Sequence, residues 1–285
     1  MYGKILVALD GSSFSEFALP AAATLAREAG ADLELVMVQD PVPPFAFGEW
    51  EEDPQAWREE YLGAVADRIA TRVKGAVDHT LRVGPVPGEL ESYVEESSPD
   101  LLVMATHGRG PLSRFWLGSV ADHMVRHASC PILLVRPDED EEPDPHADVR
   151  FDHVAVPLDG SDEAEEILER AFELGDLFDA RYTLVRVVHY PAEVVSAYLP
   201  DTVQISEEIV EEGQKEARKY LNAMAGRLEE EGRSVDVDVR VDVHPASGIL
   251  RSAREEGADL VALATHGRGG VQRALVGSVA DKLIR

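Results

Sequence analysis

Short apolar runs alternate along this chain with longer stretches that mix apolar and charged residues. In the first half, each run is a few residues long and apolar almost throughout, which is typical of strands buried on both faces of a sheet. These runs occupy residues 4–9, 33–39, 79–83, 101–105 and 132–135. Between them the pattern predicts helices at residues 14–29, 54–74 and 119–127 and a shorter helix that ends near residue 97. This alternation predicts an α/β domain with a parallel sheet.

The second half of the chain repeats this order. Its apolar runs lie at residues 153–158, 182–188, 236–243 and 260–264, and its helices are predicted at 203–231 and 247–256, with a last helix that reaches residue 285. An acidic, proline-containing segment between the halves has the composition of a linker. We therefore predict a domain at residues 1–137, a linker at 138–150 and a second domain at 151–285. The second domain stops at the position that corresponds to residue 126, so we expect it to lack the final strand.

One hexapeptide, Ala-Thr-His-Gly-Arg-Gly, occurs twice, at residues 105–110 and 264–269. Each copy ends an apolar run, and each is followed at the same spacing by Gly-Ser-Val-Ala-Asp, at residues 118–122 and 277–281. The recurrence indicates that the chain is a duplication. A glycine-rich loop between a buried strand and a helix places backbone N–H groups around an anion, so this loop is the candidate site in each half.

The residue types in the loop favour anion binding. Gly108 permits a positive φ and a close approach of the backbone to a ligand. Gly118 and Ser119 open a helix whose first N–H groups and dipole favour a phosphate, and the serine hydroxyl adds a donor. Arg109 offers a planar, permanently charged fork to phosphate oxygens. The alternatives are that Gly118 only permits tight helix packing and that Arg109 is a solvated surface charge. The second half has the same types at Gly267, Arg268, Gly277 and Ser278.

Two further residue types recur next to the candidate site. Asp10 and Asp159 follow the first strand of each half. They are expected at the carboxyl end of the sheet, where ligands of open α/β sheets bind. The alternative is that they only cap the next helix. His107 and His266 are expected to bond to their own loop backbone, and catalysis is the less favoured role for them.

These motifs resemble those of the universal stress protein family, in the Asp-Gly-Ser after the first strand, the Ala-Thr-His-Gly-Arg-Gly loop and the Gly-Ser-Val-Ala-Asp helix start. The resemblance covers almost everything outside the linker. It implies two tandem Rossmann-like domains of the adenine nucleotide alpha hydrolase type, each an open five-stranded parallel sheet with helices on both faces. Some members bind ATP and carry Gly, two residues, Gly, nine residues, then Gly-Ser or Gly-Thr. Here Ala105 and Ala264 replace the first glycine, which weakens the ATP inference.

The resemblance also implies a set of nucleotide contacts. Asp10 and Asp159 would approach the adenosine, with Val38 and Val187 against the adenine. The other implied cofactor-binding residues are Ala105, His107, Gly108, Arg109, Gly118, Ser119 and Val120 in the first domain and Ala264, His266, Gly267, Arg268, Gly277, Ser278 and Val279 in the second.

We therefore expect a tandem stress protein that binds ATP or a related adenine nucleotide, with or without magnesium, in one or both domains and acts as a regulatory protein in the stress response. Since no residues are placed as a nucleophile with its general base, no enzyme activity is expected beyond slow, incidental ATP hydrolysis. The alternative is a nucleotide-free interaction module in which the two domains pair as an intrachain pseudo-dimer. With only the first domain's final strand available, the chain is expected to form a homodimer or to leave a sheet edge unpaired.

The formal net charge of −27 restricts the partners. An acidic surface repels nucleic acid and anionic membranes. Together with the presence of only five lysines, this charge suggests a very salty cytoplasm such as that of a halophilic archaeon, where salt near 1 M screens charge over about 3 Å.

The single Cys130 is expected to be a packed core thiol. No apolar run approaches the ~20 residues of a membrane span. The start of the chain predicts a strand and no signal peptide, so we expect a cytoplasmic protein. The histidines lack the spacing of metal ligands, so we expect no metal site.

Overall fold

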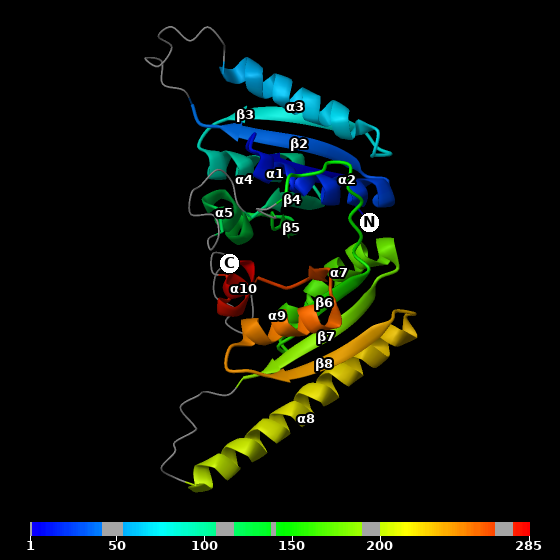
Figure 1. The fold of residues 1–285 in the computed structure, drawn as a ribbon, viewed down its shortest axis with the longest axis vertical. Coiled ribbons are helices and arrows are strands. Elements are labelled where there is room, and N and C mark those ends of the chain that lie inside the picture. The colour runs from blue at the N-terminus through cyan, green and yellow to red at the C-terminus, as the bar shows by residue number, and fades with distance from the viewer. Residues whose placement is uncertain (1, 42–53, 107–116, 138–140, 190–199, 266–275) are drawn as a thin grey trace. The chain divides into compact units, whose positions relative to one another are not determined.

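The computed structural model describes residues 2–41, 54–106, 117–137, 141–189, 200–265 and 276–285. Contacts divide the chain into two units, Met1–Arg150 with Arg285 and Phe151–Ile284, and each unit holds one parallel sheet (Figure 1). No helix in these described ranges is long and apolar enough to cross a membrane.

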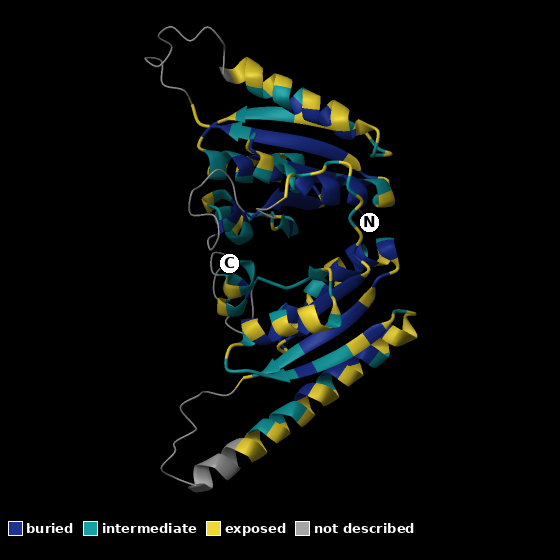
Figure 2. Ribbon diagram, in the orientation of Figure 1, coloured by how far each residue is buried: buried dark blue, intermediate teal, exposed yellow. Residues whose placement is uncertain are grey.

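In the first unit, five strands pair in the order β3-β2-β1-β4-β5, and all neighbours are parallel. The strands are β1 (Lys4–Leu9), β2 (Asp32–Gln39), β3 (Val77–Val83), β4 (Leu101–Ala105) and β5 (Ile132–Val135). The helices are α1 (Ser13–Glu16), α2 (Ala18–Ala29), α3 (Pro54–Ala70), α4 (Val86–Ser97) and α5 (Ser119–His127). The predicted five-stranded parallel sheet is confirmed. Its central strands and most of α2 are buried, while α3 and α4 have exposed residues on their outer faces (Figure 2).

In the second unit, the strands pair in the order β8-β7-β6-β9, again all parallel. The strands are β6 (His153–Pro157), β7 (Arg181–Val188), β8 (Val235–Val241) and β9 (Leu260–Val261). The helices are α6 (Asp162–Glu165), α7 (Ile167–Gly175), α8 (Pro200–Glu230), α9 (Pro245–Glu256) and α10 (Ser278–Ile284), with a 3-10 turn at Asp176–Phe178. Within the described residues this sheet has four strands, which confirms that the second domain lacks its final strand.

The strand predicted at residues 260–264 is wrong beyond Val261. Its counterpart β4 pairs with β1 on one side and β5 on the other, and all its residues are buried. By contrast, β9 pairs only with β6, and residues 260–264 are partly exposed. A strand at the edge of a sheet has a ladder of hydrogen bonds on one side only, so its regular structure ends earlier.

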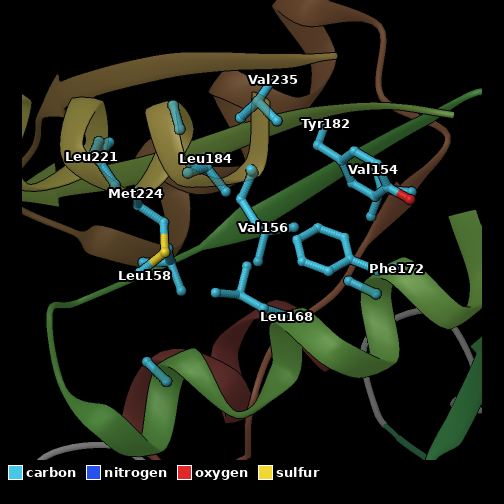
Figure 3. Close-up of a cluster of buried hydrophobic side chains, with 14 of the residues drawn as sticks. Val154, Val156, Leu158, Leu168, Phe172, Tyr182, Leu184, Leu221, Met224 and Val235 are labelled. Carbon is cyan, nitrogen blue, oxygen red and sulfur yellow. The ribbon is translucent and has the colours of Figure 1, made fainter. Parts of the chain in front are cut away.

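Both faces of the second sheet are buried. Because side chains alternate along a strand, Val154 and Val156 of β6 point to one face and Ala155 to the other. The first two pack with α7 and α8, where Phe172 meets the ring of Tyr182 edge to face with 4.9 Å between centroids (Figure 3). Ala155 packs in a second cluster with residues of α9. This two-sided burial explains why the sequence shows apolar runs and no polar alternation.

Two helices of the first unit differ from the predicted ones. The helix at residues 14–29 is divided into α1 and α2 at Phe17, although it begins after the Ser12 cap and ends at Gly30, with a φ of +68°, as expected. The helix predicted at residues 54–74 ends at Ala70. Beyond the helix, Gly75 passes against the backbone of Ala31, where a Cβ would lie 2.8 Å from the carbonyl carbon.

Within each sheet, an aspartate joins two neighbouring strands at their amino ends. The Asp100 carboxylate accepts hydrogen bonds from the backbone N–H groups of Gly3 and Lys4, at 2.7 and 2.9 Å. Asp259 does the same for Asp152 and His153, at 3.0 Å each. The duplication therefore extends to side-chain contacts that fasten the first strand of each unit to the strand beside it.

Part of the predicted acidic linker is fastened to the first unit. Arg72, whose side chain is only 9% exposed, donates to the backbone carbonyl of Ala147 at 2.9 Å and to the Asp148 carboxylate at 2.7 Å. Arg27 also donates to Asp148, at 2.8 Å. These two arginines lower the pKa of Asp148, chiefly through the hydrogen bond from Arg27. The segment is thus an ordered part of the first unit up to Arg150.

Replacing Arg72 by alanine should release this segment. The substitution removes the hydrogen bonds to Ala147 and Asp148, so the peptide bond before Asp148 becomes accessible to a protease that cleaves ahead of aspartate. We expect about tenfold faster cleavage there, read by mass spectrometry. The control is Arg170→Ala, which removes an exposed partner of Glu173 at 2.7 Å. Equal cleavage in the two variants would contradict the role of Arg72.

Candidate functional site

The candidate site of the first unit lies at the carboxyl ends of its strands. Because β1 and β4 are parallel neighbours, the residues that follow them meet at the same edge of the sheet. The start of α5 is held there, since the backbone N–H of Gly118 donates to the carbonyl of Thr106 at 2.8 Å. In the second unit Gly277 donates to Thr265 at 2.7 Å. Each helix start is thus joined to the segment that follows the preceding strand, directly after β4 in the first unit and four residues after β9 in the second.

A tight turn carries the aspartate in each unit. The Asp10 carboxylate accepts from the backbone N–H and the hydroxyl of Ser12, at 2.8 and 2.5 Å, and the Ser12 hydroxyl accepts from the N–H of Ser15 at 3.2 Å. Gly11 turns the chain with a φ of +77°. The serine is therefore the helix cap, and the alternative in which the aspartate only caps the helix is wrong. Asp10 itself is exposed at the sheet edge.

The second unit repeats this turn. Asp159 accepts from the N–H and hydroxyl of Ser161 at 2.9 and 2.6 Å, and Ser161 caps α6 by accepting from Ala164 at 3.2 Å. Gly160 has a φ of +82°. Two copies with the same geometry indicate that the turn is a defined part of the fold.

The helix α5, which follows the first loop, begins without a side-chain cap. Gly118 is the N-cap of α5 and has no side chain to bond to the first N–H groups, and the first intrahelical bond runs from Asp122 to its carbonyl at 2.8 Å. Its φ of −58° is open to any residue, so the backbone does not require glycine here. At Gly277 an added Cβ would lie 3.4 Å from the carbonyl oxygen of Thr265, an ordinary contact. Tight packing therefore does not account for this glycine.

Some of the remaining predicted site residues are described by the structure, and the loop residues are not. In the first sheet Val38 is the one partly exposed residue of its strand near the carboxyl end, and Ala105 ends β4 with an exposure of only 8%. In the second unit Val187 and Val279 pack against the same apolar cluster, so the structure brings the end of β7 and the start of α10 together. Ala264 is partly buried. The loop residues His107, Gly108, Arg109, His266, Gly267 and Arg268 lie outside the described residues.

The structure also places a tyrosine and a glutamate beside each aspartate turn, which the sequence analysis missed. The hydroxyl of Tyr61 in α3 donates to Glu16 at 2.9 Å, and that of Tyr220 in α8 donates to Glu165 at 2.7 Å. Burial, followed by the neighbouring carboxylate, raises the pKa of each tyrosine. The signal was present as two further repeats, Asp-Gly-Ser-x-x-x-Glu and Tyr-Leu-x-Ala-x-Ala-x-Arg, each of which occurs once in each half.

The single cysteine is not part of the site. Cys130 is only partly buried, so the prediction of a packed core thiol is wrong in its burial. Burial still raises the pKa of its thiol to about 11, which disfavours the reactive thiolate. Among the described residues, no group of three or more histidine, cysteine, aspartate and glutamate side chains could hold a metal ion.

Comparison with known proteins identifies the family. The profile of the universal stress protein family matches residues 1–136 and 150–285. The chain belongs to the universal stress protein family. A universal stress protein of Mycobacterium tuberculosis is 31% identical over 299 residues, which cover 98% of this chain and 92% of that protein. One from Methanocaldococcus jannaschii is 34% identical over 142 residues, which cover 48% of this chain and 83% of that protein.

Solved structures agree with this assignment at the level of the fold. The crystal structure of a universal stress protein from Archaeoglobus fulgidus superimposes with a TM-score of 0.66, covering 99% of this chain and 94% of that one, at 19% identity. The likeness shows that the tandem arrangement of two parallel-sheet units is shared with another member of the universal stress protein family.

Proposed function

We propose that this universal stress protein binds an adenine nucleotide, ATP or a close relative, at the carboxyl edge of its sheets and acts by binding. One observation carries the proposal: an exposed aspartate held in a serine-capped turn lies at the same sheet edge as a helix start that has no side-chain cap. The arrangement is built twice, around Asp10 and Gly118 and around Asp159 and Gly277.

The residues present fit such a ligand. The uncapped start of α5 leaves N–H groups for phosphate oxygens, with the Ser119 hydroxyl as a further donor. The exposed Asp10 carboxylate is an acceptor for ribose hydroxyls or the adenine amino group. Val38 would contact the adenine, and Val187 would do so in the second unit. A bound nucleotide would add phosphate charge to this edge and, with magnesium, a divalent cation.

A role in binding agrees better with these residues than a role in catalysis. The arrangement offers donors for phosphate and an acceptor for the nucleoside, and no nucleophile paired with a general base is placed among the described residues. We therefore propose that occupancy by the nucleotide is the signal that a partner in the stress response reads, and that hydrolysis is incidental.

The second candidate function is a nucleotide-free interaction module formed by the two units. The replacement of the first motif glycine by Ala105 and Ala264 favours it. The burial of Ala105 weighs against this candidate. Its side chain is only 8% exposed, so the added methyl group packs within the protein and takes little room from a ligand.

Binding of ATP in molar KCl with magnesium tests the proposal. The informative variants are Gly118→Asp and Gly277→Asp, separately and together. Aspartate is a good N-cap, so the fold should be retained, while its carboxylate takes the N–H groups and repels phosphate. We expect the double variant to bind ATP about 100-fold more weakly than the wild type.

The control is Gly226→Asp, which adds the same charge at a position of α8 where no atom lies within 4 Å of an added Cβ. It should bind as the wild type does. The two single variants assign affinity to the first or second unit. A wild-type protein that leaves millimolar ATP unbound would sink the nucleotide proposal and favour the interaction module.

A further inference from the structure

In both units a tyrosine of the long helix is bonded to the glutamate six residues after the site aspartate. We call these pairs, Tyr61–Glu16 and Tyr220–Glu165, the tyrosine latches. Their O–H···O distances are 2.9 and 2.7 Å. Each latch joins the first turn of a short helix, next to the aspartate turn, to a helix that lies tens of residues further along the chain.

Each latch lies close enough to the aspartate to act on it. The charge of Asp10 contributes to the raised pKa of Tyr61, and the charge of Asp159 to that of Tyr220. Glu16 is 14% exposed, so its bond to the tyrosine is largely shielded from water. The covalent path from the glutamate back to the aspartate is a single helical turn and the serine cap, which leaves little freedom between them.

An arginine lies beside each latch, and it comes from a helix in the first unit and from a strand in the second. In the first unit Arg68 of α3 lies 2.5 Å from Glu16. In the second unit the guanidinium of Arg186 on β7 lies over the Tyr220 ring, 5.0 Å from its centroid. An added Cβ on Gly160 would lie 3.0 Å from this guanidinium, so Arg186 also touches the aspartate turn.

We propose that the tyrosine latches are positioning elements that hold the aspartate turns in the geometry that accepts the nucleoside. The role rests on the proposed nucleotide function. The tyrosines do not touch the ligand; they act through Glu16 and Glu165 on the turns that carry Asp10 and Asp159. A turn fixed before binding loses less conformational freedom when the ligand arrives, which raises affinity without a new contact.

Matched tyrosine-to-phenylalanine variants test this role. The test variants are Tyr61→Phe and Tyr220→Phe, each made where the other unit's site is blocked by aspartate at Gly277 or Gly118. The controls are Tyr93→Phe and Tyr182→Phe, which also remove a tyrosine hydroxyl from a carboxylate, Glu34 in the first case and Asp176 in the second. We expect about tenfold weaker ATP binding in the latch variants than in their controls.

Hydrogen exchange in the nucleotide-free protein provides a second readout. The N–H groups of Ser12 and Ser15 are bonded within the first turn, and those of Ser161 and Ala164 within the second. Loss of a latch should make these amides exchange about tenfold faster, while the control substitutions leave them unchanged.

The two readouts separate the outcomes. If the wild type binds no nucleotide but the latch variants exchange faster, the proposed function fails and the positioning of the turn stands. If the wild type binds ATP but the latch variants match their controls in affinity and exchange, the latch proposal is overturned and the function stands.

Discussion

Replacing Glu34 by alanine should destabilise the first unit by about 2–3 kcal/mol. Glu34 is 8% exposed in the middle of β2, and three groups from other elements converge on it. Its carboxylate lies 2.6 Å from the ammonium of Lys4 and accepts from the hydroxyls of Thr80, at 2.9 Å, and Tyr93. Removing the carboxylate leaves the Lys4 ammonium without its partner and the Thr80 hydroxyl without its acceptor, while the Tyr93 hydroxyl can still donate to Thr80 at 3.1 Å. Leaving these groups unpaired costs more than the pair itself contributes.

Tryptophan fluorescence isolates this effect. All three tryptophans, Trp50, Trp57 and Trp116, lie in the first unit, so urea unfolding followed by fluorescence reports that unit alone. The control is Glu95→Ala, which removes an exposed carboxylate of α4 and should shift the midpoint little. A Glu34→Ala protein whose fluorescence midpoint matches that of the control would show that the cluster contributes no stability.

The same residue sets the response of the first unit to acid. Burial alone would raise the pKa of Glu34, but the bonds from Lys4, Tyr93 and Thr80 outweigh it and lower the pKa below the usual 4.5. The stabilisation is therefore fully present above that value and is lost as the pH falls through the lower pKa of the folded protein. Glu34→Gln should unfold with less dependence on pH in this range.

The second unit has a pair without a carboxylate at the corresponding place. His153 and Thr183 occupy the positions of Lys4 and Glu34, and the histidine Nε2 lies 2.7 Å from the threonine hydroxyl. The duplicated fold thus tolerates either a lysine–carboxylate pair or a histidine–hydroxyl pair at one buried site.

Hydrophobic periodicity predicted the sheet well because burial on both faces leaves a clear signature. The bounds of β1, β5 and α5 agree with the prediction, since apolar runs and a glycine-serine start mark their ends. The early end of β9 was missed. It depends on the lack of a second neighbouring strand beside β9 and not on the apolar residues of β9 themselves. Within the first sheet, the order of the strands follows from how the chain crosses over, which periodicity does not encode.

The candidate site was predictable in part. Recurrence of whole motifs identified the aspartate turn and the glycine-serine helix start, because each is contiguous in the sequence. The tyrosine latches were missed because Tyr61 and Glu16 are 45 residues apart and lie in two separate repeated motifs, and nothing in either motif indicates that the two meet. The fastening of Asp148 by Arg72 was missed for the same reason, as charge composition alone indicated a free linker. Contacts between distant segments arise from packing, which local patterns do not contain.

Gly175→Ala and Gly226→Ala should change the stability of the second unit in opposite directions. Gly175 ends α7 against the fully buried Tyr182, and an added Cβ would meet the tyrosine hydroxyl and lie 2.9 Å from two ring carbons. Tyr182 cannot yield easily, since its hydroxyl is bonded to Asp176 and its ring packs on Phe172. We expect a loss of about 3 kcal/mol from this overpacking.

Gly226 lies inside α8 with no atom within 4 Å of an added Cβ, so alanine meets no obstacle there. It should stabilise the helix by about 0.5–1 kcal/mol, because glycine has more conformational freedom to lose on folding. Far-UV circular dichroism follows both units while tryptophan fluorescence follows the first, so the difference between the two urea transitions reports the second. A Gly175→Ala protein as stable as Gly226→Ala would mean that Tyr182 can move aside. The claim that the core is tightly packed around Gly175 would then be wrong.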